Sequence, residues 1–166
     1  MGAGRWGQND GGRMISVVKI AFMTCMWLIS SIVLCGFSRG AIACNFLGLH
    51  DDKTAKLWRA FVPYSHYDGV RKWPYPNSDA DSAAARLERL AGRPQFICGE
   101  KDQVEETRRY LGQHASKTNL TFASTGFRNH NDAWILRPSK TRQQLLEWLK
   151  TNTTSKPAGH KMPADR

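Results

Sequence analysis

The chain has 166 residues, of which 41% are hydrophobic and 23% are charged. These values fit one globular domain with a packed core, and they exclude a wholly disordered chain. The formal charge of +10 does not indicate a nucleic-acid partner. From residue 107 onward there are 11 Lys or Arg against 3 Asp or Glu, but the basic residues are scattered and form no run, zinc-finger pattern or RNA-binding signature.

The cysteines carry no metal-binding pattern. Cys25, Cys35, Cys44 and Cys98 lack the CxxC or Cys/His spacing of a zinc site, and each stands among apolar residues. We therefore expect buried free thiols, no metal site and no cofactor. In an oxidising compartment they could form two disulfides in three pairings, and the sequence does not choose among these.

The N-terminal part begins with a polar, glycine-rich stretch, residues 1–13, which is expected to be a disordered leader. Residues 20–37 then contain no charged side chain, and basic residues precede them. This pattern fits a membrane helix or a signal peptide, with Ala41, Ile42 and Ala43 as a small-residue cleavage site. That interpretation predicts an exported or membrane-anchored protein.

The alternative interpretation places the same hydrophobic stretch inside the fold. A buried helix over residues 14–28 would lead into a short buried strand over residues 32–36. We prefer this interpretation because the stretch ends in Gly36 and Gly40, a glycine spacing that a cleavage or membrane-exit model does not need. It predicts a cytoplasmic protein, and a membrane partner follows only from the first interpretation.

The remaining elements alternate between strands and helices. Pro63 weakens the second strand, because proline removes a ladder donor and is normally tolerated only at strand ends or edges. Residues 68–79, rich in Gly and Pro, should form a loop that could roof a cleft. Strands are predicted at residues 32–36, 60–64, 95–98 and 120–123, helices at 41–49, 54–58, 79–91, 104–115 and from 139, and a flexible tail at 151–166. This order predicts an α/β domain over residues 14–150, with a mostly parallel sheet of about four strands flanked by helices.

The sequence Gly36-x-Ser38-x-Gly40 follows the first strand and opens an apolar helix. A sharp strand-to-helix turn forces the central residue into a strained conformation, so that its neighbours must be small. Ser38 would then project its hydroxyl at the carboxyl edge of the sheet. The N-terminus of the following helix carries partial positive charge, and the backbone N–H of Arg39 could serve as an oxyanion-hole donor.

A serine nucleophile needs a base and a carboxylate that orients the base. Asp102 follows the third strand and His130 follows the fourth, so that both should lie at the same sheet edge as Ser38. Glu100 is the rival for the acid, and His66 is the rival for the base. Alternatively, His130 is a loop histidine bonded to backbone and Asp102 caps a helix.

Two further residues follow the second strand, at the same predicted edge. We expect His66 and Tyr67 to line the cleft and to contact substrate, while His66 stays second to His130 as the general base. The acyl substrate itself is not specified by these residues.

The motifs over residues 33–41, 94–102 and 126–130 resemble those of the α/β-hydrolase superfamily, and the similarity runs from about residue 32 to residue 149. The three segments look like the strand with the nucleophile elbow, the strand with the acid and the loop with the histidine. The resemblance implies a partial α/β-hydrolase fold in which Ser38 is the nucleophile, Asp102 the acid and His130 the base. It also implies an ester, small-molecule or peptide acyl substrate and an acyl-enzyme intermediate.

The resemblance does not include the first half of the family's fold. The family's first four strands, and the loop that gives the second oxyanion donor, should precede the elbow, where only residues 1–31 stand. Loss of one such donor typically costs a factor of about 100 to 1,000 in turnover. We therefore expect a truncated hydrolase of reduced or absent activity, with an unpaired apolar edge at residues 32–35. The alternative function is an exported or membrane-anchored binding protein with an N-terminal targeting segment.

Overall fold

The computed structural model describes residues 32–114, 119–127 and 130–154. Its centre is a four-stranded sheet in which every neighbouring pair of strands is parallel. The strands are β1 (Val33–Phe37), β2 (Ala60–Tyr64), β3 (Gln95–Gly99) and β4 (Leu120–Ser124), in the spatial order β1-β2-β3-β4. All four carboxyl ends therefore lie at one edge of the sheet, where ligands bind in open α/β folds.

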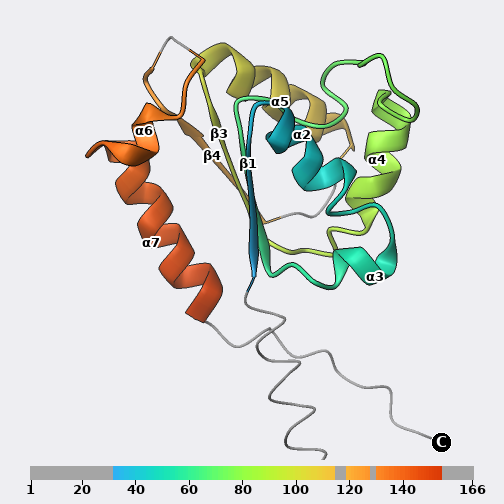
Figure 1. Cartoon of the computed structure of the whole chain (residues 1–166), viewed down its shortest axis with the longest axis horizontal. Coiled ribbons are helices and arrows are strands. Elements are labelled where there is room, and N and C mark those ends of the chain that lie inside the picture. The colour runs from blue at the N-terminus through green and yellow to red at the C-terminus, as the bar shows by residue number, and fades with distance from the viewer. Residues whose placement is uncertain (1–31, 115–118, 128–129, 155–166) are drawn as a thin grey trace, which may run out of the picture.

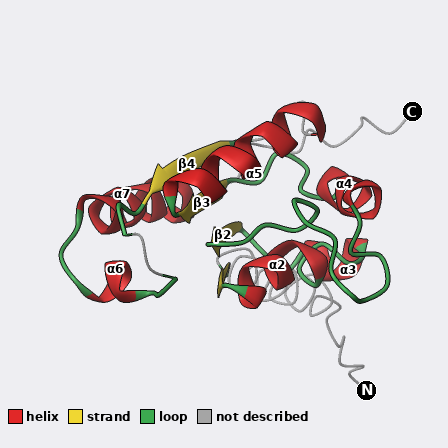
Figure 2. Cartoon of the chain, turned by 90° about the horizontal axis from the view of Figure 1, so that it is seen from above, coloured by secondary structure: helices red, strands yellow, loops and turns green. Residues whose placement is uncertain are grey.

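Helices cover both faces of this sheet. One face carries α2 (Arg39–Phe46), α3 (Asp52–Ala55), α4 (Ala80–Glu88) and α5 (Lys101–His114), and the other carries α6 (Ala133–Leu136) and α7 (Lys140–Thr154). Figures 1 and 2 show the two groups on opposite sides of the strands. The fold is therefore α/β with a four-stranded parallel sheet flanked by helices, as the alternating elements predict.

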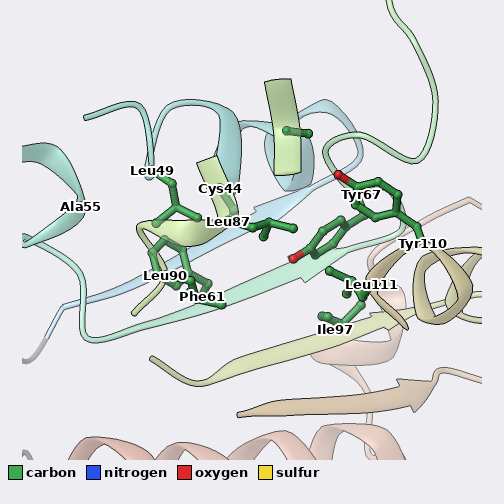
Figure 3. Close-up of a cluster of buried hydrophobic side chains, with 11 residues drawn as sticks. Cys44, Leu49, Ala55, Phe61, Tyr67, Leu87, Leu90, Ile97, Tyr110 and Leu111 are labelled. Atoms are coloured by element: carbon green, nitrogen blue, oxygen red, sulfur yellow. The ribbon is translucent and has the colours of Figure 1, made fainter. Parts of the chain in front are cut away.

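Alternation of side chains along the strands divides the core in two. Phe61 and Ile97 point to the face of α2, α4 and α5, where they pack with Leu87 and Leu111, as Figure 3 shows. Their neighbours along the chain point to the opposite face and pack against α6 and α7. The second cluster consists of Ala60, Val62, Tyr64, Phe96, Cys98, Ala123, Trp134, Leu145 and Trp148. Burial of both sheet faces is what fixes the register of the strands.

Local sequence signals account for where the helices begin. Asp51 accepts hydrogen bonds from two backbone N–H groups of α3, and Asp79 accepts one from Ser82 in α4. The hydroxyl of Ser139 accepts from the N–H of Arg142 at the start of α7. Each of these side chains satisfies a donor that the first helical turn leaves open.

Three elements differ from the sequence-based expectation. The helix α5 begins at Lys101 rather than near residue 104, which places Asp102 inside the helix. The short helix α6 was not expected, and α7 continues to Thr154, into the region predicted as a tail. Four apolar residues in α6 are too few to show a helical period.

Pro63 lies in β2, which is an interior strand of the sheet. The N–H groups of Phe61 and Ser65 donate to β3 and its flank. Because donors alternate sides along a strand, the missing N–H of Pro63 removes one bond on that same side. The strand predicted over residues 60–64 is therefore present although Pro63 lies in its interior, and the sheet lacks one hydrogen bond at this buried position.

Within the described residues β1 pairs only with β2, so that it forms one edge of this sheet. Cys44 and Cys98 are buried as expected, whereas Cys35 on β1 is exposed. None of the described helices is long and apolar enough to cross a membrane. The expected leader over residues 1–13, the helix over residues 14–28 and the tail from residue 155 lie outside the described residues.

Candidate active site

Ser38 stands in a sharp turn between β1 and α2. Its φ of 56° and ψ of −119° are sparsely populated for a residue with a side chain. The turn is fixed by two backbone hydrogen bonds: Ser38 N–H donates to Tyr64 O, and Ala41 N–H donates to Ser38 O, each at 3.0 Å. The strained conformation that the glycine spacing predicts is therefore present at this serine.

The two flanking glycines have different roles. A Cβ atom added to Gly36 would collide with the backbone carbonyl of Gly40, whereas a Cβ atom added to Gly40 would meet open space. The turn therefore requires glycine at position 36 for close backbone approach, and position 40 has no such steric requirement.

Ser38 and His130 are in hydrogen-bond contact, although 92 residues separate them in the chain. The hydroxyl Oγ of Ser38 lies 2.9 Å from Nε2 of His130. The ring of Phe37 packs on the imidazole at a centroid distance of 4.8 Å, and Tyr64 OH donates to the backbone O of neighbouring Asn131 at 2.6 Å. These contacts hold the histidine over the serine at the carboxyl edge of the sheet.

The other ring nitrogen, Nδ1, faces two oxygen groups. Ser65 Oγ lies 2.9 Å from it, and Glu100 Oε1 lies 3.9 Å from it. The Glu100 side chain is only 15% exposed, so its charge is partly shielded from water. The carboxylate that the structure brings to His130 is therefore that of Glu100, the rival candidate of the sequence analysis.

Asp102 does not take the position expected for the acid. It lies in the first turn of α5 with its side chain exposed, and no contact among the described residues joins it to His130. The reason is the early start of the helix: Val104 N–H already donates to Glu100 O at 3.0 Å. Glu100 thus directly follows the last residue of β3, and Asp102 is the second residue of the helix.

The Gln103 side chain connects the groups behind the imidazole. Its amide is satisfied when the nitrogen faces three acceptors: the Ser65 carbonyl at 2.5 Å, the Ser65 hydroxyl at 3.1 Å and the Glu100 carboxylate. The opposite orientation would place an amide oxygen against these oxygens, which is unfavourable. Gln103 therefore fixes both Ser65 and Glu100 in place.

The histidine expected to line the cleft lies beside the candidate base. The His66 ring stacks on the ring of His130 at 5.3 Å and packs on Trp73 at 5.7 Å. Burial, the nearby His130 and the charge of Arg71 lower the pKa of His66 below its ordinary value. His66 also lines a pocket next to Ser65, together with Val70 and Trp73.

Tyr67 borders the same pocket but is not available to a substrate through its hydroxyl. Its side chain is buried, and the hydroxyl donates to Gln95 Oε1 at 2.8 Å. Burial raises the pKa of Tyr67 far above its ordinary value. The structure thus places Tyr67 in the core beneath the pocket, where it supports the wall.

Arg39 is the first residue of α2, and its side chain is exposed. Its backbone N–H belongs to the helical turn that has no intrahelical acceptor, and no partner for it occurs in the described part of the chain. A backbone N–H at a helix N-terminus carries partial positive charge and is available to an anion near Ser38. The second oxyanion donor, expected ahead of the elbow, would fall outside the described residues.

Two polar residues of the site, Ser65 and Gln103, were not singled out from the sequence. Ser65 directly follows a strand at the same edge as the other site residues, which is the signal that could have found it. Gln103 lies in the part of α5 that was expected to be a loop. Its position one helical turn from strand β3 becomes clear only when the helix start is known.

No cluster of three or more His, Cys, Asp or Glu side chains that could hold a metal ion occurs within the described ranges. The polar groups at the sheet edge are a hydroxyl, an imidazole and a partly shielded carboxylate, which are groups that can accept and donate protons. Comparison of the chain with protein-family models, curated proteins and solved structures finds no match.

Proposed function

We propose that the chain is a serine hydrolase of the α/β-hydrolase type that cleaves esters or other acyl compounds through an acyl-enzyme. The observation that carries the proposal is the 2.9 Å contact between Ser38 Oγ and His130 Nε2, made by a serine in a strained turn at a helix N-terminus. A nucleophile and base within hydrogen-bond distance, with the base oriented by a third group, form the signature of nucleophilic catalysis.

The first half of the proposed reaction forms the acyl-enzyme. Ser38 Oγ attacks the acyl carbon while Nε2 of His130 takes the hydroxyl proton, and the carbonyl oxygen gains a negative charge. The N–H of Arg39 faces this oxygen at the positive end of α2. When the tetrahedral intermediate collapses, the leaving group departs with the proton from His130, and the acyl group stays on Ser38.

The second half of the proposed reaction hydrolyses the acyl-enzyme and regenerates the free enzyme. A water molecule gives its proton to His130 and attacks the acyl carbon, and the Ser38 oxygen then leaves and takes that proton back. Water reaches this site readily, because the His130 side chain is 45% exposed. During both halves the Glu100 carboxylate stabilises the imidazolium that forms transiently at His130.

Glu100 is favoured over an arrangement in which no carboxylate stabilises the His130 imidazolium. An imidazolium without a nearby carboxylate would have to be stabilised by the Ser65 hydroxyl and by solvent alone. Glu100 is within ion-pair distance of Nδ1, and Gln103 holds it there. The proposed set is therefore Ser38 as nucleophile, His130 as base and Glu100 as the acid, with Asp102 replaced in that role.

The test is hydrolysis of a short-chain nitrophenyl ester by the full chain. The proposal expects turnover by the wild-type protein and a loss to the background rate in Ser38→Ala. Ser124→Ala is the matched control, because Ser124 also ends a strand at this edge but its side chain is exposed. Equal rates in wild type and Ser38→Ala, with both proteins folded, would exclude Ser38 as the nucleophile.

A further inference from the structure

Ser65 occupies a backbone conformation that a serine rarely adopts. It follows β2 directly, with a φ of 82° and only 5% of its surface exposed. Its N–H donates to Cys98 O at 2.9 Å, which fixes the backbone against β3. A glycine would adopt this φ without strain, so that a serine here carries a conformational cost that its hydroxyl has to offset.

Of the two side-chain oxygens that face Nδ1 of His130 in the described ranges, the hydroxyl of Ser65 is the closer. It lies 2.9 Å away, within hydrogen-bond range, while Glu100 Oε1 at 3.9 Å is too far for a direct hydrogen bond. Among the residues that the structure describes, Nδ1 therefore has one hydrogen-bond partner of good length, and that partner is uncharged.

The tautomer of His130 determines whether it can act as a base toward Ser38. Nε2 can accept the Ser38 proton only when the neutral ring carries its hydrogen on Nδ1. That hydrogen needs an acceptor, and Ser65 Oγ is placed to accept it. The Gln103 amide nitrogen, 3.1 Å from the same oxygen, holds it in position.

We propose that Ser65 is a positioning residue that accepts the Nδ1 hydrogen of His130, sets the tautomer of the ring and leaves to Glu100 a purely electrostatic role. The inference rests on the proposed function and adds a fourth residue to it. In a Ser-His-Asp triad one carboxylate both accepts the Nδ1 hydrogen and stabilises the imidazolium. Here the Ser65 hydroxyl would perform the first task and the Glu100 carboxylate the second.

Two substitutions remove the hydroxyl with opposite effects on the backbone. Ser65→Gly relieves the strain at φ 82°, whereas Ser65→Ala keeps a Cβ atom in that conformation. A result common to both variants therefore reports the hydroxyl and not the backbone. Ser124→Ala again serves as the matched control, since no contact joins its side chain to His130 among the described residues.

The first readout is the ring tautomer, measured by ¹⁵N NMR of histidine-labelled full chain at a pH where the rings are neutral. His130→Gln assigns the resonance. We expect wild type to carry its hydrogen on Nδ1, and both Ser65 variants to shift toward hydrogen on Nε2. This measurement does not require that the protein turns over any substrate.

The second readout is the rate at which a fluorophosphonate labels Ser38. We expect both Ser65 variants to label about tenfold more slowly than wild type, which corresponds to the loss of one hydrogen bond of about 1.4 kcal/mol. An unchanged tautomer in Ser65→Gly and Ser65→Ala would overturn the inference, whatever the rates. A shifted tautomer in a chain that labels nowhere would instead retain the positioning role and reject the hydrolase proposal.

Discussion

Glu100 Oε1 lies 3.9 Å from Nδ1 of His130, while Asp102, two residues later, lies exposed in the first turn of α5. Two unit charges at about 4 Å attract by about 1 kcal/mol in water and about 4 kcal/mol in a partly shielded site. We therefore expect Glu100→Gln to lower kcat/KM by roughly 10- to 100-fold and Asp102→Asn to change it by less than about twofold. Ester hydrolysis by the two variants measures this, and the reverse ranking would return the acid role to Asp102.

The glycines on either side of Ser38 should respond differently to alanine. A Cβ atom at Gly36 would collide with the Gly40 carbonyl, so that Gly36→Ala should lower the free energy of unfolding by about 1 to 3 kcal/mol. Gly40→Ala meets open space in a helix and should be neutral or stabilising by up to about 1 kcal/mol. Urea unfolding of the two variants measures both changes in the free energy of unfolding. Equal losses in both variants would contradict the turn geometry.

Asp68 and Arg86 form a buried ion pair that holds the start of the loop over residues 68–79 against α4. Arg86 Nε lies 2.8 Å from Asp68 Oδ2, and Arg86 also donates to Asn77 O at 2.9 Å. Removing one partner leaves a buried charge unpaired, so that Asp68→Asn should cost about 3 to 5 kcal/mol of stability. Chemical denaturation measures this loss.

The matched control for that pair is the exposed pair of Arg71 and Glu106, at 3.2 Å. Its side chains are 60% and 41% exposed, so that Glu106→Gln should cost less than about 1 kcal/mol. A comparable loss for the exposed and buried pairs would show that burial does not set the strength of the Asp68 contact.

His66 should make folding stability fall as the pH falls. Burial, His130 and Arg71 hold the pKa of His66 below its ordinary value, so the unfolded chain takes up a proton before the folded one does. The contribution of neutral His66 to the free energy of unfolding is complete above about pH 6.5, the ordinary histidine pKa. It is lost as the pH drops toward the pKa of His66 in the folded chain. Urea midpoints from pH 7 to pH 5 should therefore decline less in His66→Gln than in wild type. Parallel declines in the two proteins would contradict a lowered pKa.

The strands were predictable because each is a short apolar run bounded by turn residues. The expected and observed bounds of β2 coincide, and those of β1, β3 and β4 differ by one residue at the ends. The parallel arrangement followed from the helices between them. The turn at Ser38 was also predictable, because Gly36 permits the close backbone approach in the turn that connects β1 to α2.

The carboxylate that lies nearest His130 was harder to predict, because its identity depends on where one helix begins. Glu100 and Asp102 are alike in chemistry and lie two residues apart, and no strong N-cap residue marks the start of α5. A helix that starts three residues earlier rotates one carboxylate away and leaves the other at the sheet edge. Ser65 was missed for a different reason: its place directly after β2 is its one sequence signal, and no motif surrounds the serine itself.

The central step of the proposed reaction is activation of Ser38 by His130, whose Nε2 lies 2.9 Å from the serine hydroxyl. The direct measurement is the second-order rate constant for fluorophosphonate labelling of the full chain, with the modified residue located by peptide mass spectrometry. We predict labelling at Ser38 in wild type and a rate lower by about 100- to 10,000-fold in His130→Ala, the range typical of general-base catalysis. Equal rates in folded wild type and His130→Ala, or labelling at a residue other than Ser38, would contradict it.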